Sequence, residues 1–385
     1  MIPYGHQNIS QQDIDSVVEV LRSDWLTQGP MVERFETAIA SFCDAKHAVA
    51  SCNATAALHL SCLALGVGKG DYVWTSPNTF AASANCALYC NANIDFIDID
   101  PQTYNISIDC LKNKLEQAAK INKLPKVVIP VHFAGQSCEM KAIKELADKY
   151  KFYIIEDASH AIGGKYCQQN IGCCKYSDIT IFSFHPVKII TTGEGGMALT
   201  NDKTLYDKLK LFVSHGITRN PDLMQGEYQG PWYVEQISLG YNYRITDIQC
   251  ALGLSQAHRI NEFVAKRQEL AARYNEALKE LPIILPYQKE YNYSAFHLYV
   301  IALRLEELQK SRKQIFTELR KADIGVAVHY IPVHTHPYYQ NLGFKWGDFP
   351  EAERYYQRTI TLPLYPSLTQ KDQDFVINKI SELVK

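Results

Sequence analysis

The sequence lacks a surplus of charge of either sign. Its 39 lysine and arginine residues nearly balance 41 aspartate and glutamate residues, and the formal net charge is -2. Neither half of the chain is visibly basic, so nothing in it predicts binding to nucleic acid or to an anionic membrane. The chain also lacks any apolar run that approaches the roughly 18 residues of a membrane-spanning helix. Its opening residues do not combine a basic region with an apolar stretch, so we expect no secretory signal and a cytoplasmic location.

Paired cysteine motifs are also missing, although the chain has 11 cysteines. No CxxC pair occurs, and the adjacent Cys173 and Cys174 lie in a polar segment. Disulfide frameworks are typical of short secreted chains, so we expect free thiols here. His334 and His336 resemble a pair of metal ligands, but no cysteine or acid stands at a suitable spacing beside them. We therefore predict no metal site.

What the chain does have is length and a regular alternation. Its 385 residues, 46% of them hydrophobic, exceed the usual size of one compact domain. Apolar runs rich in valine and isoleucine alternate with helical segments, which predicts an α/β fold with a mostly parallel sheet covered on both faces. A long amphipathic segment that begins near residue 260 separates a large domain (1–258) from a smaller C-terminal α/β domain (259–385). The expected elements include a helix over 80–89 and a strand over 326–331.

Two apolar runs in the middle of the chain each deliver a reactive side chain. One run ends at Asp157, and the other ends near Phe184 and is followed by Lys188 and a glycine-rich turn. Ligands of open α/β sheets bind beyond the carboxyl ends of the strands. A lysine at this edge is a candidate Schiff-base nucleophile, and an aspartate is a candidate partner for a pyridinium nitrogen. Together they indicate pyridoxal phosphate as a cofactor.

That cofactor also needs a site for its phosphate. A short buried strand leads into Asn53, which can cap the helix that follows it. The exposed amides of Ala54 and Thr55 at the start of this helix can bind an anion, and Ser183 lies on the strand that leads to the lysine. When this segment is considered alone, an ordinary capped helix explains it equally well.

Each candidate side chain also has an ordinary structural interpretation. A lysine is usually a solvated charge, but Lys188 lies between apolar residues and a glycine-rich turn. Asp157 could be a helix cap, and His160 would then share its face three residues later. For His160, hydrogen bonding around the site and a spectator role are both open. His185 precedes a proline and is expected to position other groups, and Phe80 could cover the cofactor ring.

These residues lie in stretches that resemble the DegT/DnrJ/StrS-type sugar aminotransferases, which have the aspartate aminotransferase fold (fold type I). The matching stretches follow one another through the whole large domain: SCNATAALHLSCLALGVGKGDYVWTSPNTFAASANC, FIDID, VIPVHFAG, IIEDASHAIGGKY, FSFHPVKIITTGEGGM and LGYNYRITDIQCALGLSQ. The resemblance implies that Lys188 is catalytic and carries pyridoxal 5'-phosphate, with these further cofactor contacts: Ala54, Thr55, Phe80, Asp157, His160, Ser183 and Asn242. A related branch that deoxygenates sugars has histidine in place of the lysine, so Lys188 implies transamination.

The resemblance also implies partners. Asn242 matches an asparagine that reaches the phosphate of the neighbouring subunit, which implies a homodimer with shared active sites. The stretches YGHQNISQQDID, DWLTQGP and GVAVHYIPVHTHPYY most resemble the branch of the pseudaminic acid pathway. That branch aminates carbon 4 of a UDP-linked 4-keto-6-deoxy-N-acetylhexosamine, with L-glutamate as the expected donor. The implied substrate contacts are Tyr4, Asp24, Trp25, Leu26, Thr27, His185, Ala327, Val328, His329 and Tyr330.

Three other interpretations stay open at this point. The substrate could belong to a perosamine-type or bacillosamine-type pathway. A catalytically silent regulatory protein on the same fold would be expected to lose Lys188 or Asp157, and both are present. A metal-dependent enzyme would use His329, His334 and His336, which no carboxylate accompanies at ligand spacing.

Overall fold

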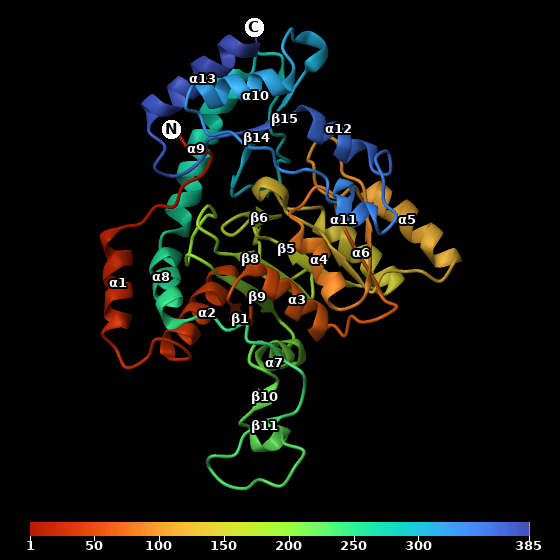
Figure 1. Cartoon of the computed structure of the whole chain (residues 1–385), viewed down its shortest axis with the longest axis vertical. Helices are drawn as coiled ribbons and strands as arrows, with labels where there is room; N and C mark the ends of the chain where they lie inside the picture. Colours follow the sequence, from red (N-terminus) through yellow and green to blue (C-terminus); the bar gives the residue numbers. More distant parts are fainter. Residues whose placement is uncertain (385) are drawn as a thin grey trace.

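The computed structural model describes residues 1–384. Its centre is a seven-stranded sheet with the strand order β1-β9-β8-β5-β4-β2-β3. Strands β1, β9, β8 and β5 of this sheet are labelled in Figure 1. The strands are β1 (His47–Ser51), β2 (Tyr72–Thr75), β3 (Asn93–Phe96), β4 (Val127–Ile129), β5 (Tyr153–Asp157), β8 (Ile179–Ser183) and β9 (Gly196–Thr200). Neighbouring strands from β8 through to β3 are parallel. The predicted α/β fold with a mostly parallel sheet is therefore confirmed.

Strand β9 is the exception, because it is antiparallel to both β8 and β1. Parallel neighbours need a crossover of about a dozen or more residues, which is usually helical. The segment 184–195 between β8 and β9 contains no helix and returns directly to the next position in the sheet. As a result, Lys188 lies on a loop at the carboxyl end of β8.

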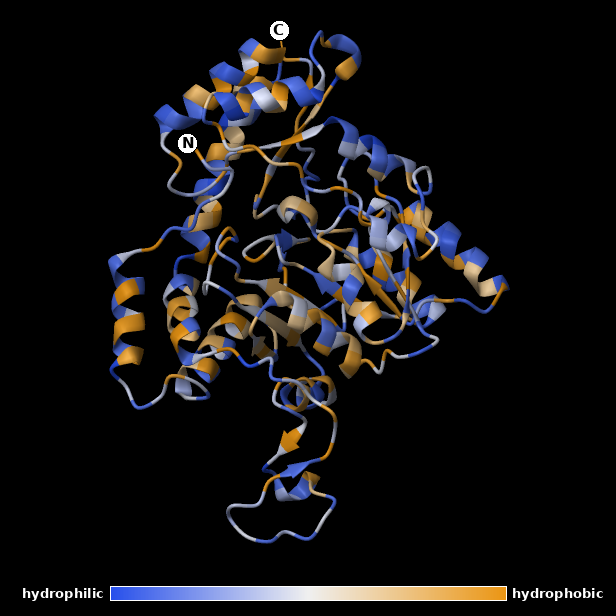
Figure 2. Cartoon of the chain, in the orientation of Figure 1, coloured by the Kyte–Doolittle hydropathy of each residue, from blue (hydrophilic) through white to orange (hydrophobic). Residues whose placement is uncertain are grey.

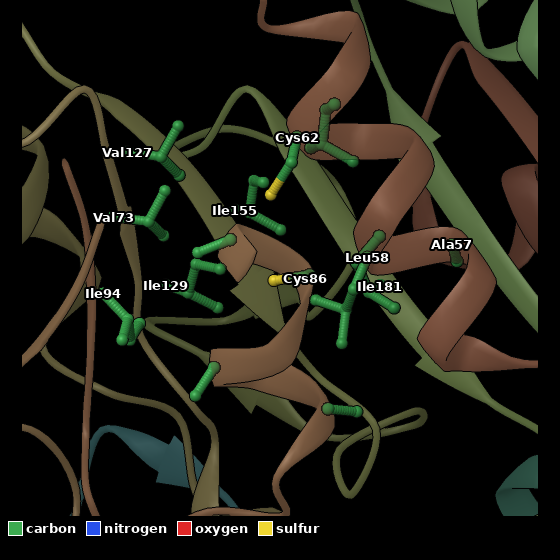
Figure 3. Packing of buried hydrophobic residues seen from close by; sticks show 14 of the residues in the cluster. Ala57, Leu58, Cys62, Val73, Cys86, Ile94, Val127, Ile129, Ile155 and Ile181 are labelled. Carbon is green, nitrogen blue, oxygen red and sulfur yellow. The ribbon is translucent and has the colours of Figure 1, made fainter. Parts of the chain in front are cut away.

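Helices cover both faces of this sheet. Those that precede residue 258 are α1 (Gln11–Leu21), α2 (Pro30–Cys43), α3 (Ala54–Ala64), α4 (Ala82–Tyr89), α5 (Ile108–Lys120), α6 (Met140–Tyr150), α7 (Lys203–Phe212) and α8 (Asp247–Ala257). On one face, Ile155 packs with Leu58 of α3 and Cys86 of α4 (Figure 3). On the other face, Ile154 packs with Ile143 of α6. Successive strand residues point to opposite faces, so a strand buried on both faces is apolar throughout.

The last third of the chain forms a smaller body with its own antiparallel sheet. The sheet contains β12 (Ile283–Ile284), β14 (Tyr299–Leu303) and β15 (Thr359–Leu362), and the helices of this last third are α9 (Ile260–Leu278), α10 (Arg312–Lys321), α11 (Pro337–Gln340), α12 (Pro350–Arg358) and α13 (Gln370–Val384). Helices α10 and α13 pack with the small sheet, whereas buried residues of α11 and α12 belong to the core cluster of the large sheet. A further small sheet joins β13 (Asn292–Tyr293) to β6 (Lys165–Tyr166) and β7 (Gln169–Asn170).

Helix α9 connects the two bodies. It rises from beside the large sheet to α10 and α13 (Figure 1). Its residues Ile260 and Phe263 belong to a core cluster with the large sheet, whereas Leu270 and Tyr274 belong to the cluster around the small sheet. The domain division at residue 258 stays a prediction, since this one helix contributes to both cores.

A hairpin projects from the body beyond α7 (Figure 1). It contains β10 (Ile217–Thr218), a 3-10 turn (Pro221–Leu223) and β11 (Glu235–Gln236). Figure 2 shows hydrophobic residues beside polar ones along this projection. The side chains of Trp232 and Leu239 are both 75% exposed. Apolar groups gathered on an exposed segment are typical of a contact surface.

Two expected elements differ in the structure. The helix expected over 80–89 begins only at Ala82. The strand expected over 326–331 is wrong, because only Ala327 pairs there, in an isolated bridge with Thr361 of β15. Beyond that bridge the chain leaves the sheet, and the main-chain N–H of Tyr330 donates to Asn78 Oδ1 at 3.3 Å. No helix within residues 1–384 is both long and apolar enough to span a membrane.

Candidate active site

A cavity of about 540 Å³ lies at the carboxyl ends of β5 and β8. Strands of the large sheet, the start of α3 and the segment before β15 each contribute to its wall. The predicted site residues that line it are Tyr4, Ala54, Thr55, Phe80, Asp157, His160, Ser183, His185, Lys188, His329 and Tyr330. The structure thus brings together side chains that lie as far apart in the sequence as the first and last quarters of the chain.

Lys188 is presented by the loop between β8 and β9. The two ends of this loop are tied together at Phe184, whose N–H donates to Gly195 O at 2.9 Å and whose carbonyl accepts from Thr192 N at 3.0 Å. Inside the loop, the N–H of Lys188 donates to His185 O at 2.9 Å and closes a turn. The side chain is half-buried in the cavity wall.

The electrostatic setting of Lys188 increases the fraction of neutral amine. Burial lowers the pKa of its ammonium group from 10.5 to about 8, because the charged form loses solvation. The Asp157 carboxylate opposes this shift by attraction. A lysine whose pKa lies near physiological pH can act both as a nucleophile and as a base.

Asp157 is the last residue of β5, and its side chain is buried. Its Oδ2 accepts a hydrogen bond from Ser83 Oγ at 2.6 Å, and its Oδ1 accepts one from the N–H of Ser159 at 3.1 Å. A turn follows Asp157, so this residue does not cap a helix. The two hydrogen bonds orient the carboxylate at the edge of the cavity.

The start of α3 has the geometry expected of an anion site. Asn53 caps the helix by accepting a hydrogen bond from the N–H of Ala56 at 2.8 Å. The N–H groups of Ala54 and Thr55 find no acceptor within residues 1–384, and both residues line the cavity. Unpaired amides at a helix N-terminus attract anions, phosphate among them. Ser183 adds a hydroxyl to the same cavity.

A second wall of the cavity consists of aromatic and imidazole rings. His160 lies on this wall, and its Nδ1 accepts from the N–H of Ala134 at 3.3 Å while its Nε2 lies 3.0 Å from Tyr330 Oη. His329 Nδ1 lies 2.9 Å from Thr361 Oγ1. Burial and, to a smaller extent, the Lys188 charge together lower the pKa of His329 to about 4. Burial also lowers the pKa of His160 well below its usual value, so both imidazoles are neutral at physiological pH.

This combination of a lysine, an oriented carboxylate and an anion site can be compared with known proteins. Residues 7–381 match the sequence pattern of the DegT/DnrJ/EryC1/StrS aminotransferase family. The chain belongs to this family. It is a pyridoxal-phosphate-dependent sugar aminotransferase, and the predicted family, fold type and enzyme class are confirmed.

Named relatives within the family span the full chain. Spore coat polysaccharide biosynthesis protein SpsC of Bacillus subtilis is 42% identical, over 100% of this chain and 97% of the relative. A UDP-4-amino-4,6-dideoxy-N-acetyl-beta-L-altrosamine transaminase of Campylobacter jejuni is 38% identical, over 100% of this chain and 98% of the relative.

Two solved structures of family members have the same fold. Helicobacter pylori PseC, an aminotransferase of pseudoaminic acid biosynthesis, matches with a TM-score of 0.90 and 31% identity, over 100% of this chain and 99% of PseC. A Streptococcus pneumoniae protein described as a sugar aminotransferase, solved in its PMP form, matches with a TM-score of 0.91 and 29% identity, over 100% and 99% of the two chains.

Several residues predicted from the family resemblance lie outside this cavity. The segment of Asp24, Trp25, Leu26 and Thr27 is exposed and packs beside the start of α8, where the N–H of Asp247 donates to Leu26 O at 3.1 Å. Asn242 is also exposed and bridges to Ser214 at the base of the projecting hairpin. Ala327 and Val328 precede the part of their segment that reaches the cavity. The roles of all these residues stay predictions.

Ser83 and His297 line the cavity but were not predicted as site residues from the sequence. Ser83 lies one helical turn beyond Phe80 and holds Asp157, and its only sequence signal was that spacing. His297 lines the cavity, is 4% exposed, and its ring centroid lies 4.4 Å from that of His160. A histidine within the apolar run before β14 was the signal that could have identified it.

The histidines considered as metal ligands have other partners. His334 Nε2 lies 2.9 Å from Glu353 Oε1, whereas His329 bonds to Thr361. Within residues 1–384, no group of three or more His, Cys, Asp or Glu side chains is arranged to hold a metal ion. All 11 cysteines have free thiols.

Proposed function

We propose that this enzyme transfers an amino group from L-glutamate to carbon 4 of a UDP-linked 4-keto-6-deoxy-N-acetylhexosamine, as in pseudaminic acid biosynthesis. The named activity of the Campylobacter relative and the pathway of the Helicobacter structure support this choice of sugar. The observation that carries the chemistry is the single cavity that contains Lys188, Asp157 and the unpaired amides of α3.

The residues of this cavity fit pyridoxal phosphate. The amides of Ala54 and Thr55, together with the Ser183 hydroxyl, suit a phosphate group. The oriented carboxylate of Asp157 suits a protonated ring nitrogen. Phe80 has a side chain that is 63% exposed at the cavity wall, so its ring is available to cover an aromatic ligand.

Lys188 is the proton carrier in this proposal. Pyridoxal phosphate, when bound, withdraws electrons from the carbon that loses or gains a proton. Because the pKa of Lys188 is lowered to about 8, a useful fraction of its free amine is neutral near physiological pH. Its Nζ can then take the proton from the α-carbon of glutamate and return one to carbon 4 of the sugar. Asp157, held by Ser83 and Ser159, keeps the ring nitrogen protonated during both transfers.

The ring-lined wall of the cavity suits the sugar. Tyr4 packs beside His329 with ring centroids 5.3 Å apart. His329 is neutral and uses Nδ1 for Thr361, so its other nitrogen is available to a hydroxyl or carbonyl group. His185, exposed beside Lys188, lies where it can position the same ligand.

A homodimer with shared active sites completes the proposal. Asn242 lies at the base of the projecting hairpin and does not line the cavity of its own chain. The hairpin presents exposed apolar side chains, including Trp232 and Leu239, that a second copy of the chain would cover. A partner's hairpin would thereby bring a second Asn242 to the phosphate.

Absorbance spectra of the purified, cofactor-loaded protein test both half-reactions. We expect the cofactor band to shift when glutamate is added and to recover when the UDP-4-keto sugar is added. The 4-amino product is then identified by NMR. Recovery only with a perosamine-type or bacillosamine-type precursor would contradict the proposed sugar, and no shift with glutamate would contradict the donor.

A further inference from the structure

Glu156 immediately precedes Asp157 in β5, and the two side chains point to opposite faces of the sheet. Successive strand residues alternate between the faces, so Asp157 reaches the cavity and Glu156 does not. Glu156 is nevertheless only 6% exposed. A buried carboxylate destabilises a fold unless hydrogen bonds replace its solvation, so the partners of Glu156 indicate its role.

Two side chains donate hydrogen bonds to Glu156, one from each side of β5. His132, which follows β4, is buried, and its Nε2 lies 2.8 Å from Glu156 Oε2. The main-chain N–H of Cys138 donates to His132 Nδ1 at 3.1 Å, so Nδ1 accepts and the imidazole proton lies on Nε2. His132 therefore donates to Glu156. Thr180 is paired with Glu156 in β8, and its Oγ1 donates to Glu156 Oε1 at 3.3 Å.

The main chains of β4 and β5 are weakly paired at this edge of the sheet. The regular ladder between the two strands contains only two residue pairs. Beyond it, Pro130 has no N–H to donate, and pairing resumes only in an isolated bridge at Asp157. There the N–H of Asp157 donates to Pro130 O at 2.9 Å, and its carbonyl accepts from His132 N at 3.0 Å. The bond between His132 and Glu156 adds a side-chain link where the ladder is thin.

These links lie directly behind the reactive groups of the cavity. Asp157 is the last residue of β5, and the loop that carries Lys188 leaves the end of β8. The Glu156 carboxylate joins β5 to both of its neighbours one residue before Asp157. Without these bonds, the end of β5 would be free to shift relative to the lysine loop, although Glu156 itself does not line the cavity.

We propose that Glu156 is a positioning residue for Asp157. Ser83 and Ser159 orient the Asp157 carboxylate within the cavity, whereas Glu156 fixes the end of β5 from the opposite face of the sheet. Glu156 thereby holds the aspartate where it meets the ring nitrogen of the cofactor, and it acts only through Asp157. The inference rests on the proposed function for the role of Asp157.

Three variants change the links of Glu156, and a fourth is the matched control. Glu156→Ala removes both links, and Thr180→Val removes one of them while keeping the volume of the side chain. Glu156→Gln keeps an acceptor for His132, and the Thr180 hydroxyl can rotate to accept from the new amide, so both links remain. The control is Glu353→Ala, because Glu353 is 8% exposed, its Oε1 lies 2.9 Å from His334 Nε2, and it does not line the cavity.

Three measurements on the cofactor-loaded variants separate positioning from folding. Thermal unfolding gives the loss of stability. Nitrogen NMR of a cofactor that is isotope-labelled at its ring nitrogen gives the protonated fraction of that nitrogen. Single-turnover reactions over a range of glutamate concentrations give the rate of the first half-reaction and the apparent affinity for glutamate.

We expect Glu156→Ala and Glu353→Ala to lose similar stability but to differ at the site. Glu156→Ala should lower the protonated fraction of the ring nitrogen and slow the glutamate half-reaction by roughly 10- to 100-fold, as a misplaced reacting group does, with little change in affinity. Thr180→Val should have a smaller effect of the same kind. Glu156→Gln and Glu353→Ala should match wild type in protonation and rate. In an Asp157→Asn background, Glu156→Ala should slow the reaction no further, because it acts through Asp157.

Two results would overturn the inference. One is a Glu156→Ala enzyme with the protonation and rate of wild type; if that variant does not fold, wild-type values in Thr180→Val decide the same way. The other is an equal slowing by Glu156→Ala in the wild-type and Asp157→Asn backgrounds. If Asp157→Asn leaves the ring nitrogen fully protonated, the proposed role of Asp157 fails and this inference with it. If protonation is lost in Asp157→Asn but not in Glu156→Ala, this inference alone fails. The NMR measurement needs no substrate, so it applies whichever donor and sugar the enzyme accepts.

Discussion

At the residue scale, the site holds its two charged groups by different means. Asp157 is oriented by two hydrogen bonds, from Ser83 and Ser159. Lys188 has no hydrogen-bond acceptor for its Nζ within residues 1–384, and burial is the main cause of its lowered pKa. The carboxylate is therefore held by hydrogen bonds, whereas the amine is free to move, as the proposed proton transfer between two carbons requires.

The lowered pKa of Lys188 predicts how the apoprotein reacts with pyridoxal phosphate. Only the neutral amine attacks the aldehyde, so the rate should rise with pH and level off above a midpoint near 8. Because the Asp157 charge raises the pKa of Lys188, Asp157→Asn should move the midpoint to lower pH. Stopped-flow absorbance gives the rate, and competitive acetylation of Lys188 with the exposed Lys69 as an internal control gives the same midpoint independently. A midpoint near the ordinary 10.5 would contradict the assignment.

At the scale of elements, the anion site depends on how closely β9 passes the start of α3. Gly196 begins β9, and a Cβ at this position would lie 2.4 Å from the N atom of Ala54 and 2.5 Å from the carbonyl oxygen of Asn53. Side chains do not approach a backbone so closely, so only glycine allows this packing. The strand that follows the lysine loop thus also shapes the predicted phosphate site.

Replacing Gly196 should therefore weaken phosphate binding. Gly196→Ala is expected to displace the amides of Ala54 and Thr55 and to reduce the affinity for pyridoxal phosphate by about 10-fold or more, with a loss of stability of about 1–3 kcal/mol from overpacking. Fluorescence titration and thermal unfolding, each with and without the cofactor, measure the two effects. Gly68→Ala is the control, because nothing lies within 4 Å of a Cβ there. Unchanged cofactor affinity in Gly196→Ala would show that this contact does not shape the site.

At the scale of the whole molecule, the cavity contains all the predicted cofactor contacts except Asn242. Lys188 and Asp157 lie in one cavity, whereas Asn242 lies outside it, at the base of the hairpin. The hairpin projects away from the body that contains the cavity (Figure 1). The proposed dimer accounts for both observations, because a residue that does not reach the cavity of its own chain can contact the cavity of the neighbouring chain.

Mixing inactive variants tests the shared site. A heterodimer of Lys188→Ala and Asn242→Ala chains has one site with both defects and one site with neither. Random pairing of equal amounts should therefore restore activity in about a quarter of all sites. Lys188→Ala mixed with Asp157→Ala should restore none, because these two residues serve the same cavity. If the first mixture also stays inactive, Asn242 does not act across a dimer.

The kinds and order of the elements could be predicted because their signals are local. Strand β8 is buried at all five positions, and its apolar run is visible in the sequence. The segment 326–331 is equally apolar at its start, yet it makes only one bridge to β15. Strand pairing depends on the neighbouring strand as well as on the segment itself. Here the main-chain N–H of Tyr330 donates to the side chain of Asn78, which precedes it by 252 residues. Periodicity contains no information about such a contact.

The sequence by itself determined the α/β fold, the family, the lysine and aspartate at the strand ends, and the capped helix that leaves two amides free. The fold, the strand ends and the capped helix follow from hydrophobic patterns, capping and turn chemistry within short windows of the chain. The family follows from the resemblance of long stretches of the chain to known members. Only the tertiary structure decided which groups form hydrogen bonds with the side chains of the site. The hydrogen bond from Ser83 to Asp157 spans 74 residues, and that between His160 and Tyr330 spans 170. Such contacts form when packing brings distant segments together, and they set the direction of each hydrogen bond in the site.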